Sequence, residues 1–255
     1  WCDGCGLGTI LNCLLRAIKE VGLSYRNIAF VSGIGCAGRS TGYVRFDSLH
    51  VTHGRALPVA IAVKVSKPDL KPIILSGDGD LFAIGTSHFV HAARRNVDML
   101  VICSNNFNYG MTGGQFSPTT PSGSLTATTP YGSWENALNL AAFAAACGAV
   151  YVSRWASHTP VQLTASIKRA LKKKGFCFVE VVNQCPTLYG RHNKLGDAAQ
   201  MMKQIKAVSQ IRSGTSPYEA VMDPDKKITL GNFLDIEKPE FSNEMWRLKM
   251  VGENA

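Results

Sequence analysis

Short apolar segments alternate with segments of helical periodicity along most of this 255-residue chain. Four runs predict strands and a fifth is a weaker candidate: Ile28–Ser32, Pro72–Ser76, Met99–Ser104, Cys177–Asn183 and, weaker, Ala149–Ser153. They lack polar alternation, as is typical of parallel strands covered on both faces. Five intervening segments predict helices: Leu7–Val21, Gly54–Ser66, Leu81–Arg95, Trp134–Cys147 and His158–Lys174. We therefore expect an α/β fold, a doubly wound and mostly parallel sheet that binds ligands at the carboxyl ends of its strands.

The composition supports a sizeable core. Hydrophobic residues make up 45% of the chain and charged residues 18%, which excludes a globally disordered protein. The net charge of +9 suggests an acidic protein, a phosphate cofactor or nucleic acid as partner, or simply a solvated basic surface. Because no secretory signal and no run of about eighteen apolar residues is present, we expect a cytoplasmic protein without membrane contact. The first residue is Trp1 rather than Met, so a short N-terminal stretch is expected to be missing.

The chain is expected to have two parts. Residues 1–197 carry the motifs described below and form the predicted main domain, and residues 198–255 form a C-terminal extension that packs on it or on a partner subunit. Within the main domain, Gly110–Ser133 is rich in Gly, Ser, Thr and Pro. It is too long for an ordinary connection, which favours a functional loop.

The segment Gly77–Asp80, which reads GDGD, stands where a predicted strand ends and a helix begins. Glycines let backbone N–H groups approach an anion, but Asp78 would repel a diphosphate unless a cation lay between them. Asn106 follows the next predicted strand, and neighbouring parallel strands bring their carboxyl ends together. Carboxylate and carbonyl oxygens suit Mg²⁺. We therefore predict that Asp78, Asn106 and the Asn108 carbonyl bind Mg²⁺; the alternative is two unrelated turns.

The spacing of this motif, GDG followed about 25 residues later by NN, resembles the diphosphate-binding motif of thiamine diphosphate (TPP) enzymes. A dinucleotide-binding site or a P-loop is disfavoured, because the glycine pattern of neither motif is present.

Four of the eight cysteines are candidate metal ligands. Cys2 and Cys5 form a C-x2-C pair, Cys36 follows the first predicted strand and Cys185 follows the last. The last two belong to the same sheet edge as the predicted Mg²⁺ site, and four thiolates converging there would suit Zn²⁺ or an iron–sulfur cluster. Ordinary buried cysteines are the alternative. That alternative fits the remaining four, which lie in apolar helix or strand patterns: Cys13, Cys103, Cys147 and Cys177.

Taken in order, the motifs resemble the TPP-binding beta subunit of 2-oxoacid:ferredoxin oxidoreductases, and most of all the 2-oxoglutarate type. The resemblance covers most of the chain: WCDGCG at the start, GIGCAGR at 33–39, THGRA at 52–56, GDGDLFAIG at 77–85, NNFNYGMTGGQFSPTTP at 105–121, QCPT at 184–187 and HNKLGD ending at Asp197. One departure concerns Thr112-Gly113-Gly114. Some relatives of broad 2-oxoacid range carry a Lys in this segment, so their substrate contacts do not transfer directly.

The resemblance implies roles for individual residues. It implies a [4Fe–4S] cluster on Cys2, Cys5, Cys36 and Cys185, and Mg²⁺ on Asp78, Asn106 and Asn108. It implies TPP contacts at nine positions: Ile34, Gly35, Cys36, Ala37, His53, Gly79, Asp80, Gly110 and Met111. His53 is also the candidate catalytic residue, in contact with substrate or with the TPP pyrimidine. Without the resemblance, a lone His after a polar turn is more typical of a structural role.

The resemblance also implies a reaction and partners. The reaction is oxidative decarboxylation of a 2-oxoacid with coenzyme A to an acyl-CoA and CO₂, reversible in principle, with ferredoxin as electron acceptor. 2-Oxoglutarate is the first candidate substrate and branched-chain 2-oxoacids are the next. The carboxylate that activates TPP is expected from an alpha (pyrimidine-domain) subunit, so we expect an αβ assembly, commonly duplicated to a heterotetramer. The basic Lys168–Lys174 face is a hypothetical docking site for an acidic ferredoxin.

Two other functions stay open at this point. A non-redox TPP decarboxylase or synthase would share the GDG and NN motifs without needing four cysteines at the sheet edge. A basic nucleic-acid-binding protein with a structural zinc site would explain the charge and the thiols. No recognised nucleic-acid motif is present, so we expect no nucleic-acid partner.

Overall fold

The computed structural model describes residues 1–253. Its strands are β1 (Ile28–Ser32), β2 (Ser48–His50), β3 (Lys71–Gly77), β4 (Met99–Asn105), β5 (Tyr151–Ala156), β6 (Phe176–Val182), β7 (Ser209–Ile211), β8 (Met222–Asp223) and β9 (Lys227–Asp235). Its α-helices are α1 (Leu7–Val21), α2 (Ala56–Ser66), α3 (Thr86–Arg94), α4 (Leu140–Ala146), α5 (Pro160–Lys172), α6 (Ala198–Val208) and α7 (Phe241–Glu253). None of the helices in this part of the chain is long and apolar enough to cross a membrane.

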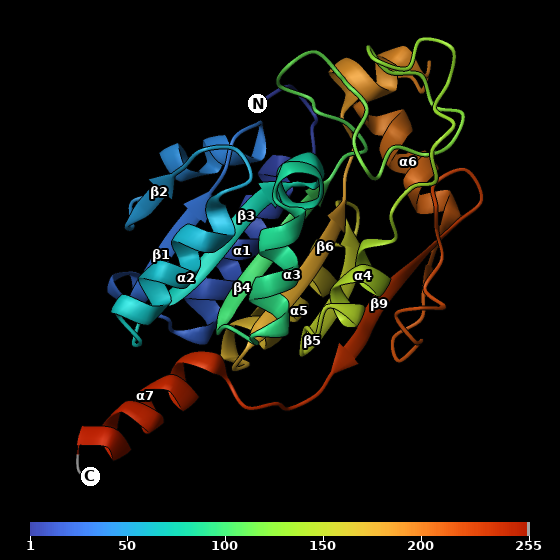
Figure 1. The fold of residues 1–255 in the computed structure, drawn as a ribbon. Helices are drawn as coiled ribbons and strands as arrows, with labels where there is room; N and C mark the ends of the chain where they lie inside the picture. The colour runs from blue at the N-terminus through green and yellow to red at the C-terminus, as the bar shows by residue number, and fades with distance from the viewer. Residues whose placement is uncertain (254–255) are drawn as a thin grey trace.

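The strands form one sheet of nine in the order β2-β1-β3-β4-β6-β5-β9-β7, with β8 paired to β9 (Figure 1). All neighbours from β2 to β5 pair in parallel, whereas β9 runs antiparallel to β5. Because these strands are parallel, their carboxyl ends lie at the same edge of the sheet. The predicted doubly wound, mostly parallel α/β fold is confirmed.

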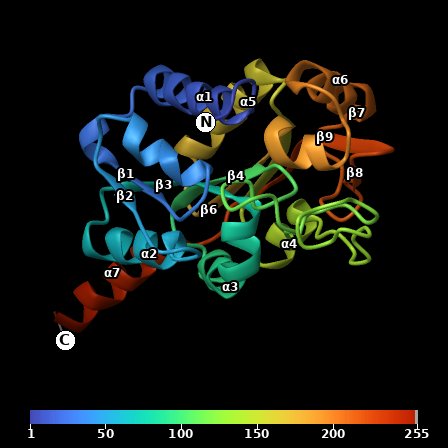
Figure 2. The same cartoon turned by 90° about the horizontal axis from the view of Figure 1, so that it is seen from above.

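Helices cover both faces of the sheet (Figure 2). On one face, Ile10 and Leu14 of α1 and Leu163 of α5 join a buried cluster with alternate strand residues such as Phe30. On the other face, residues of α2, α3 and α4 form a second cluster with the intervening strand residues such as Val31. Neighbouring strand residues therefore belong to different cores, which explains why the strand segments are apolar without alternation.

Four of the five predicted helices are shorter in the structure, two of them, α2 and α5, by only one or two residues at an end and the other two by much more. The segment predicted as one helix over Leu81–Arg95 is a π-helical turn, Asp80–Ile84, followed by α3. They join at Gly85, where a Cβ would lie 2.4 Å from the Asp80 carbonyl oxygen, so a larger residue does not fit this join. The segment predicted as a helix from Trp134 is helical only from Leu140 onward, in α4.

The part of the chain after Asp197 contributes to the sheet. Asp197 begins α6 with a capping box, in which its side chain accepts from Gln200 N (2.8 Å) and its N–H donates to Gln200 Oε1 (2.8 Å). β9, which carried no sequence prediction, then pairs with β5, and α7 projects beyond the sheet (Figure 1). Residues 198–235 therefore pack on the main domain; a contact with a partner subunit stays a prediction.

Charged side chains cluster around Asp98, which directly precedes β4. Asp98 accepts hydrogen bonds from Lys64 Nζ (3.0 Å), Lys71 Nζ (2.5 Å) and Lys174 Nζ (3.3 Å). Lys64 and Lys71 are buried together with Asp98. Burial raises the pKa of Asp98, but the three ammonium groups outweigh it and lower the pKa to about 2.

We expect Asp98→Asn to lower the free energy of unfolding by roughly 3–5 kcal/mol, because two buried ammonium groups lose their counter-charge. The folded-state pKa of about 2 lies below the ordinary aspartate value, so the carboxylate contributes stability above that ordinary value. This contribution is lost as the pH falls towards 2. Urea unfolding from pH 7 to pH 3 measures both effects. Asp69→Asn, at an exposed aspartate, is the control. An unchanged pH dependence in Asp98→Asn would contradict the interpretation.

Candidate functional site

The carboxyl ends of β3 and β4 lie side by side, because Gly77 pairs with Ser104 in their parallel register. Asp78 directly follows β3 and Asn106 closely follows β4. Both residues line one pocket of about 170 Å³, which we call the strand-end pocket. The structure therefore brings together the two residues that the sequence placed at one edge.

The strand-end pocket contains every residue predicted to contact TPP or Mg²⁺. It is lined by Ile34, Gly35, Cys36, Ala37, His53, Gly77, Asp78, Gly79, Asp80, Ser104, Asn106, Asn108, Tyr109, Gly110, Met111 and Thr112. The sequence places Cys36, Asp78 and Asn106 after three different predicted strands, and tertiary packing gathers them with the other lining residues into one cavity.

Asp78 is held by the long loop that follows β4. Its side chain is 1% exposed, and its Oδ2 accepts hydrogen bonds from Ser117 Oγ (2.6 Å) and Thr119 Oγ1 (2.6 Å). Burial raises the pKa of Asp78 to about 6, although the two hydroxyls act against this. The sequence marked the loop as functional but did not single out Ser117 and Thr119. Both residues lie in the QFSPTTP part of the motifs that carry the family resemblance, and this motif was the only sequence feature that could have indicated them.

Asp80 binds three separate segments of the chain. Its Oδ1 accepts from Ile34 N (3.1 Å) and Gly54 N (2.8 Å), and its Oδ2 accepts from Ser76 Oγ (2.6 Å). The approach is close: a Cβ on Gly33 would lie 2.2 Å from Oδ2, so this position requires glycine. The Asp80 carboxylate therefore builds the pocket wall through internal hydrogen bonds.

His53 is paired with Asp80. Its Nδ1 lies 2.6 Å from Asp80 Oδ1, and its ring makes an edge contact with Tyr109 at a centroid distance of 5.8 Å. A carboxylate acceptor at Nδ1 favours the proton on that nitrogen and leaves Nε2 as the nitrogen available to a ligand. Tyr109, which the sequence did not single out, also packs on Gly79, where a Cβ would lie 2.4 Å from its ring.

The turn after β4 has an unusual backbone. Phe107 stands between Asn106 and Asn108 with a φ of 64°, a left-handed conformation that costs a non-glycine residue about 1–2 kcal/mol. Its N–H donates to Asn105 Oδ1 (3.4 Å), and its carbonyl accepts from Thr120 Oγ1 (2.6 Å). A hydrogen bond joins Asn106 and Asn108: Asn108 Nδ2 donates to the Asn106 carbonyl (3.0 Å).

The four candidate cysteines line a second pocket of about 310 Å³, which we call the thiol pocket. Cys2, Cys5, Cys36 and Cys185 are all free. A Cβ at Gly110 would lie 3.5 Å from Cys36 Sγ and 3.7 Å from Cys185 Sγ, so both sulfur atoms face one point.

The thiols also affect one another electrostatically. Burial, followed by the neighbouring thiols of Cys185, Cys2 and Cys5, raises the pKa of Cys36 to about 11. Burial, and to a lesser extent the charge of Cys2, raises the pKa of Cys5. Among residues 1–253, no three or more His, Cys, Asp or Glu side chains are grouped closely enough to hold a single metal ion.

The two pockets adjoin. Cys36, Asn106 and Met111 line both of them. Trp1, which the sequence did not single out, closes one side of the thiol pocket: its Nε1 donates to the Cys36 carbonyl (2.6 Å) and its ring contacts Tyr43. The other four cysteines lie apart, with Cys13, Cys103 and Cys177 buried and Cys147 half-buried at the end of α4.

Several basic residues at the end of α5 form ion pairs within the chain. Lys168 pairs with Glu20, and Lys173 pairs with Asp235 and Glu237. Lys174 contacts Asp98. These ion pairs reduce the free positive charge of the Lys168–Lys174 face, and docking of an acidic ferredoxin there stays a prediction.

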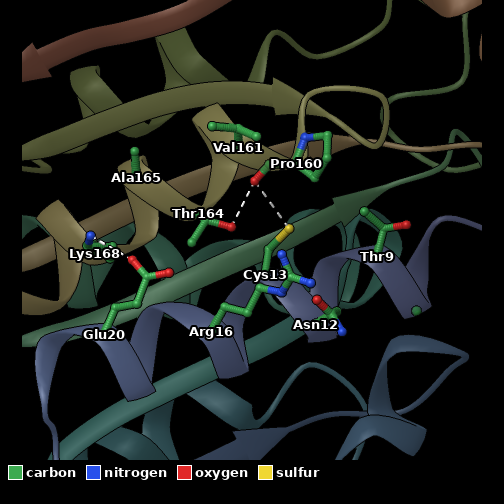
Figure 3. Close-up of a pocket in the computed structure, with 11 residues that line it drawn as sticks. Thr9, Asn12, Cys13, Arg16, Glu20, Pro160, Val161, Thr164, Ala165 and Lys168 are labelled. Atoms are coloured by element: carbon green, nitrogen blue, oxygen red, sulfur yellow. Dashed lines mark hydrogen bonds and ion pairs between the residues drawn. The ribbon is translucent and has the colours of Figure 1, made fainter.

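A larger groove of about 620 Å³ lies between α1 and α5 (Figure 3). Cys13 Sγ and Thr164 Oγ1 both donate to the Pro160 carbonyl, and Glu20 pairs with Lys168 across the groove. None of the candidate site residues lines this groove. We therefore place the functional site in the strand-end and thiol pockets, despite their smaller volume.

Comparison with known proteins identifies the domain. Residues 33–181 match the family described as thiamine pyrophosphate enzyme, C-terminal TPP binding domain. This range contains the whole strand-end pocket.

Similar proteins agree with this match. The 2-oxoglutarate synthase subunit KorB of Methanocaldococcus jannaschii is 50% identical over 248 residues, which are 97% of this chain and 92% of that protein. The 2-oxoacid:ferredoxin oxidoreductase subunit beta of Saccharolobus solfataricus is 41% identical over 196 residues, which are 76% of this chain and 64% of that protein.

A solved structure is similar over the whole fold. It is a 2-oxoglutarate:ferredoxin oxidoreductase from Magnetococcus marinus with 2-oxoglutarate, coenzyme A and succinyl-CoA bound. The TM-score is 0.89 at 33% sequence identity, and the match covers 99% of this chain and 87% of that chain. The chain therefore belongs to the thiamine pyrophosphate enzymes and, among them, to the beta subunits of the 2-oxoacid:ferredoxin oxidoreductases.

Proposed function

We propose that this chain binds TPP, Mg²⁺ and a [4Fe–4S] cluster, and that with an alpha subunit it converts 2-oxoglutarate and coenzyme A into succinyl-CoA and CO₂. Two electrons pass to ferredoxin, and the reaction is reversible in principle. One observation carries the proposal: the strand-end pocket and the thiol pocket adjoin and share Cys36, Asn106 and Met111. TPP in the strand-end pocket and an iron–sulfur cluster in the thiol pocket would therefore lie next to each other.

The donors around Asp78 fit Mg²⁺. Its carboxylate is buried, and the side chains that bond it, Ser117 and Thr119, are neutral hydroxyls. A buried carboxylate without a cationic partner is costly, so a bound cation would stabilise it. The Asn106 amide and the Asn108 carbonyl add the neutral oxygen ligands that Mg²⁺ accepts, and phosphate oxygens and water would complete the octahedron.

The strand-end pocket fits a diphosphate cofactor. Gly35 leaves backbone free of a side chain along the pocket, and Gly79 directly precedes the helical turn after β3. Backbone N–H groups at such a turn favour an anion. Asp80 fixes the segments around Ile34 and Gly54 on the opposite side.

The thiol pocket fits a [4Fe–4S] cluster. Such a cluster takes four cysteine thiolates, each on a different iron, so its ligands stand further apart than those of a single ion. Four free thiols that line one pocket are such a set. A reducing, cytoplasmic compartment would keep them available.

When bound, TPP supplies a nucleophilic carbon and an electron sink for decarboxylation, and the cluster supplies one-electron acceptance. The chain's own residues hold and orient these groups. Asp80 fixes the ring of His53 through Nδ1, so that Nε2 can donate to or accept from the substrate or pyrimidine. Cys36 and Met111 form the common wall between the two pockets.

The proposed partners follow from the same family. The carboxylate that activates the TPP aminopyrimidine would come from the alpha subunit, in an αβ assembly that is commonly duplicated. Coenzyme A as co-substrate is supported by the similar structure, in which coenzyme A and succinyl-CoA are bound. Ferredoxin is the proposed electron acceptor.

The proposal is tested by anaerobic purification with the native partner subunit, followed by CoA-dependent viologen reduction with a panel of 2-oxoacids. We expect 2-oxoglutarate to give the highest kcat/KM, and branched-chain 2-oxoacids to follow. Equal rates across all acids would reject the 2-oxoglutarate assignment. Decarboxylation without viologen reduction would instead indicate a non-redox TPP enzyme.

Asp78→Asn tests the Mg²⁺ ligand. We expect at least ~10–100-fold weaker Mg²⁺-dependent TPP binding by titration calorimetry, because the charged ligand is lost. Iron content is expected to stay at the wild-type level. Asp69→Asn serves as a control for loss of one carboxylate at an exposed position. Wild-type TPP affinity in folded Asp78→Asn would argue against this ligand.

Cys185→Ser tests the cluster. We expect loss of most bound iron and sulfide, together with the broad visible absorbance of an iron–sulfur centre, because one of four thiolate ligands is removed. Cys147→Ser, at the half-buried cysteine outside the thiol pocket, is the matched control. Equal iron and sulfide in the two variants would contradict the assignment.

A further inference from the structure

A buried ion pair lies in the middle of the sheet below the strand-end pocket. Arg154 on β5 and Glu180 on β6 face each other in register, and both side chains are 0% exposed. Arg154 Nε donates to Glu180 Oε2 (2.7 Å). Apolar residues of similar volume often stabilise such a position as well as an ion pair does, so stability alone is a weak reason for this pair.

The second oxygen of Glu180 reaches the next strand. Glu180 Oε1 accepts a hydrogen bond from Asn105 Nδ2 (2.8 Å), and Asn105 is the fully buried last residue of β4. A carboxylate can only accept, so it selects the amide orientation that places Nδ2 towards itself. The Asn105 Oδ1 therefore points towards the turn that follows β4.

That turn carries two of the three proposed Mg²⁺ ligands. Asn105 Oδ1 accepts from Phe107 N (3.4 Å), and Phe107 holds the left-handed conformation between Asn106 and Asn108. With the amide reversed, Nδ2 would face the Phe107 N–H and two donors would oppose each other. Glu180 therefore favours the one amide orientation that supports the turn.

Arg154 ties this arrangement to the rest of the chain. Its Nη2 donates to Asn139 Oδ1 (2.7 Å) at the end of the long loop. Its Nη1 donates to the carbonyls of Val221 (3.1 Å) and Thr229 (3.4 Å). The guanidinium that holds Glu180 is thus fixed by residues 220–229, which lie outside the matched TPP-binding domain.

We propose that Glu180 is a positioning residue for the Mg²⁺ site, acting through the Asn105 side chain on the Asn106–Asn108 turn, with Arg154 holding its carboxylate in place. The inference rests on the proposed function, since it concerns the affinity for Mg²⁺ in the presence of TPP. Glu180 itself does not line the strand-end pocket.

Reversing the hydrogen bond tests this role. In N105D two carboxylates face each other, and in E180Q one oxygen must serve both Arg154 and Asn105. In the double variant N105D/E180Q, the new amide at 180 donates to the new carboxylate at 105 and its oxygen accepts from Arg154. The charge of the pair and the bond between strands are both retained. Asn105→Ala, which is neutral, gives the same measurement if a charged single variant does not fold.

Each variant is purified with its alpha subunit, and the apparent Kd for Mg²⁺ is measured from the Mg²⁺ dependence of TPP binding by calorimetry. We expect each single variant to bind Mg²⁺ ~10–100-fold more weakly, and the double variant to return to within about threefold of wild type. Wild-type Kd values in folded single variants, or a double variant as weak as the singles, would overturn the inference. A wild-type protein that binds no TPP at any Mg²⁺ concentration would overturn the proposed function as well.

Asn96→Ala separates positioning from general loss of stability. Asn96 is also a buried asparagine with a bonded amide: its Oδ1 accepts from Phe176 N (2.8 Å) and its Nδ2 donates to the Pro239 carbonyl (2.9 Å). It precedes β4 at the opposite end from the pocket. We expect a lower unfolding midpoint with an unchanged Kd for Mg²⁺. A loss of Mg²⁺ affinity equal to that of the Asn105 variants would show a purely structural effect and refute the positioning role.

Discussion

The parallel register of β3 and β4 is the constraint on which the site depends. Because Gly77 pairs with Ser104, β3 and β4 end at nearly the same level of the sheet. The segments that follow the two strands are therefore adjacent. Asp78 and Asn106 are then neighbours without any direct bond between them. A slip of this register by one residue would turn the strand side chains to the opposite faces, and the two cores on either side of the sheet do not allow this.

Buried polar groups then shape the pocket walls. Asp80 binds backbone and side-chain donors from three segments, and its close contact with Gly33 leaves no space for a side chain there. Ser117 and Thr119 bring the long loop onto Asp78. Because buried polar groups must be bonded, each of these side chains fixes the segment it contacts.

Much of the fold and the site could be predicted from the sequence. Parallel strands covered on both faces are continuous apolar runs, so β1, β3, β4 and β6 were recognisable, and α1 was predicted with its observed bounds. β9 was not recognisable as a strand of this sheet, because no local signal indicates that it pairs antiparallel with β5. Ser117, Thr119, Tyr109 and Trp1 were missed as site residues, since their importance comes from contacts with residues far away in sequence.

The amino-acid sequence by itself determined the central parallel strands and the chemistry: the apolar runs, the glycines beside the aspartates, and the asparagines and cysteines at strand ends. Only the tertiary structure decided that Cys2 and Cys5 join Cys36 and Cys185 in one pocket, and that this pocket shares a wall with the other. It also decided that Lys168 of α5 contacts Glu20, and that Lys173 and Lys174, which follow this helix, contact Asp235 and Asp98. The physical reason is that hydrophobic periodicity is a local property, whereas contacts between charges, thiols and amides depend on which strands and loops the packing brings together.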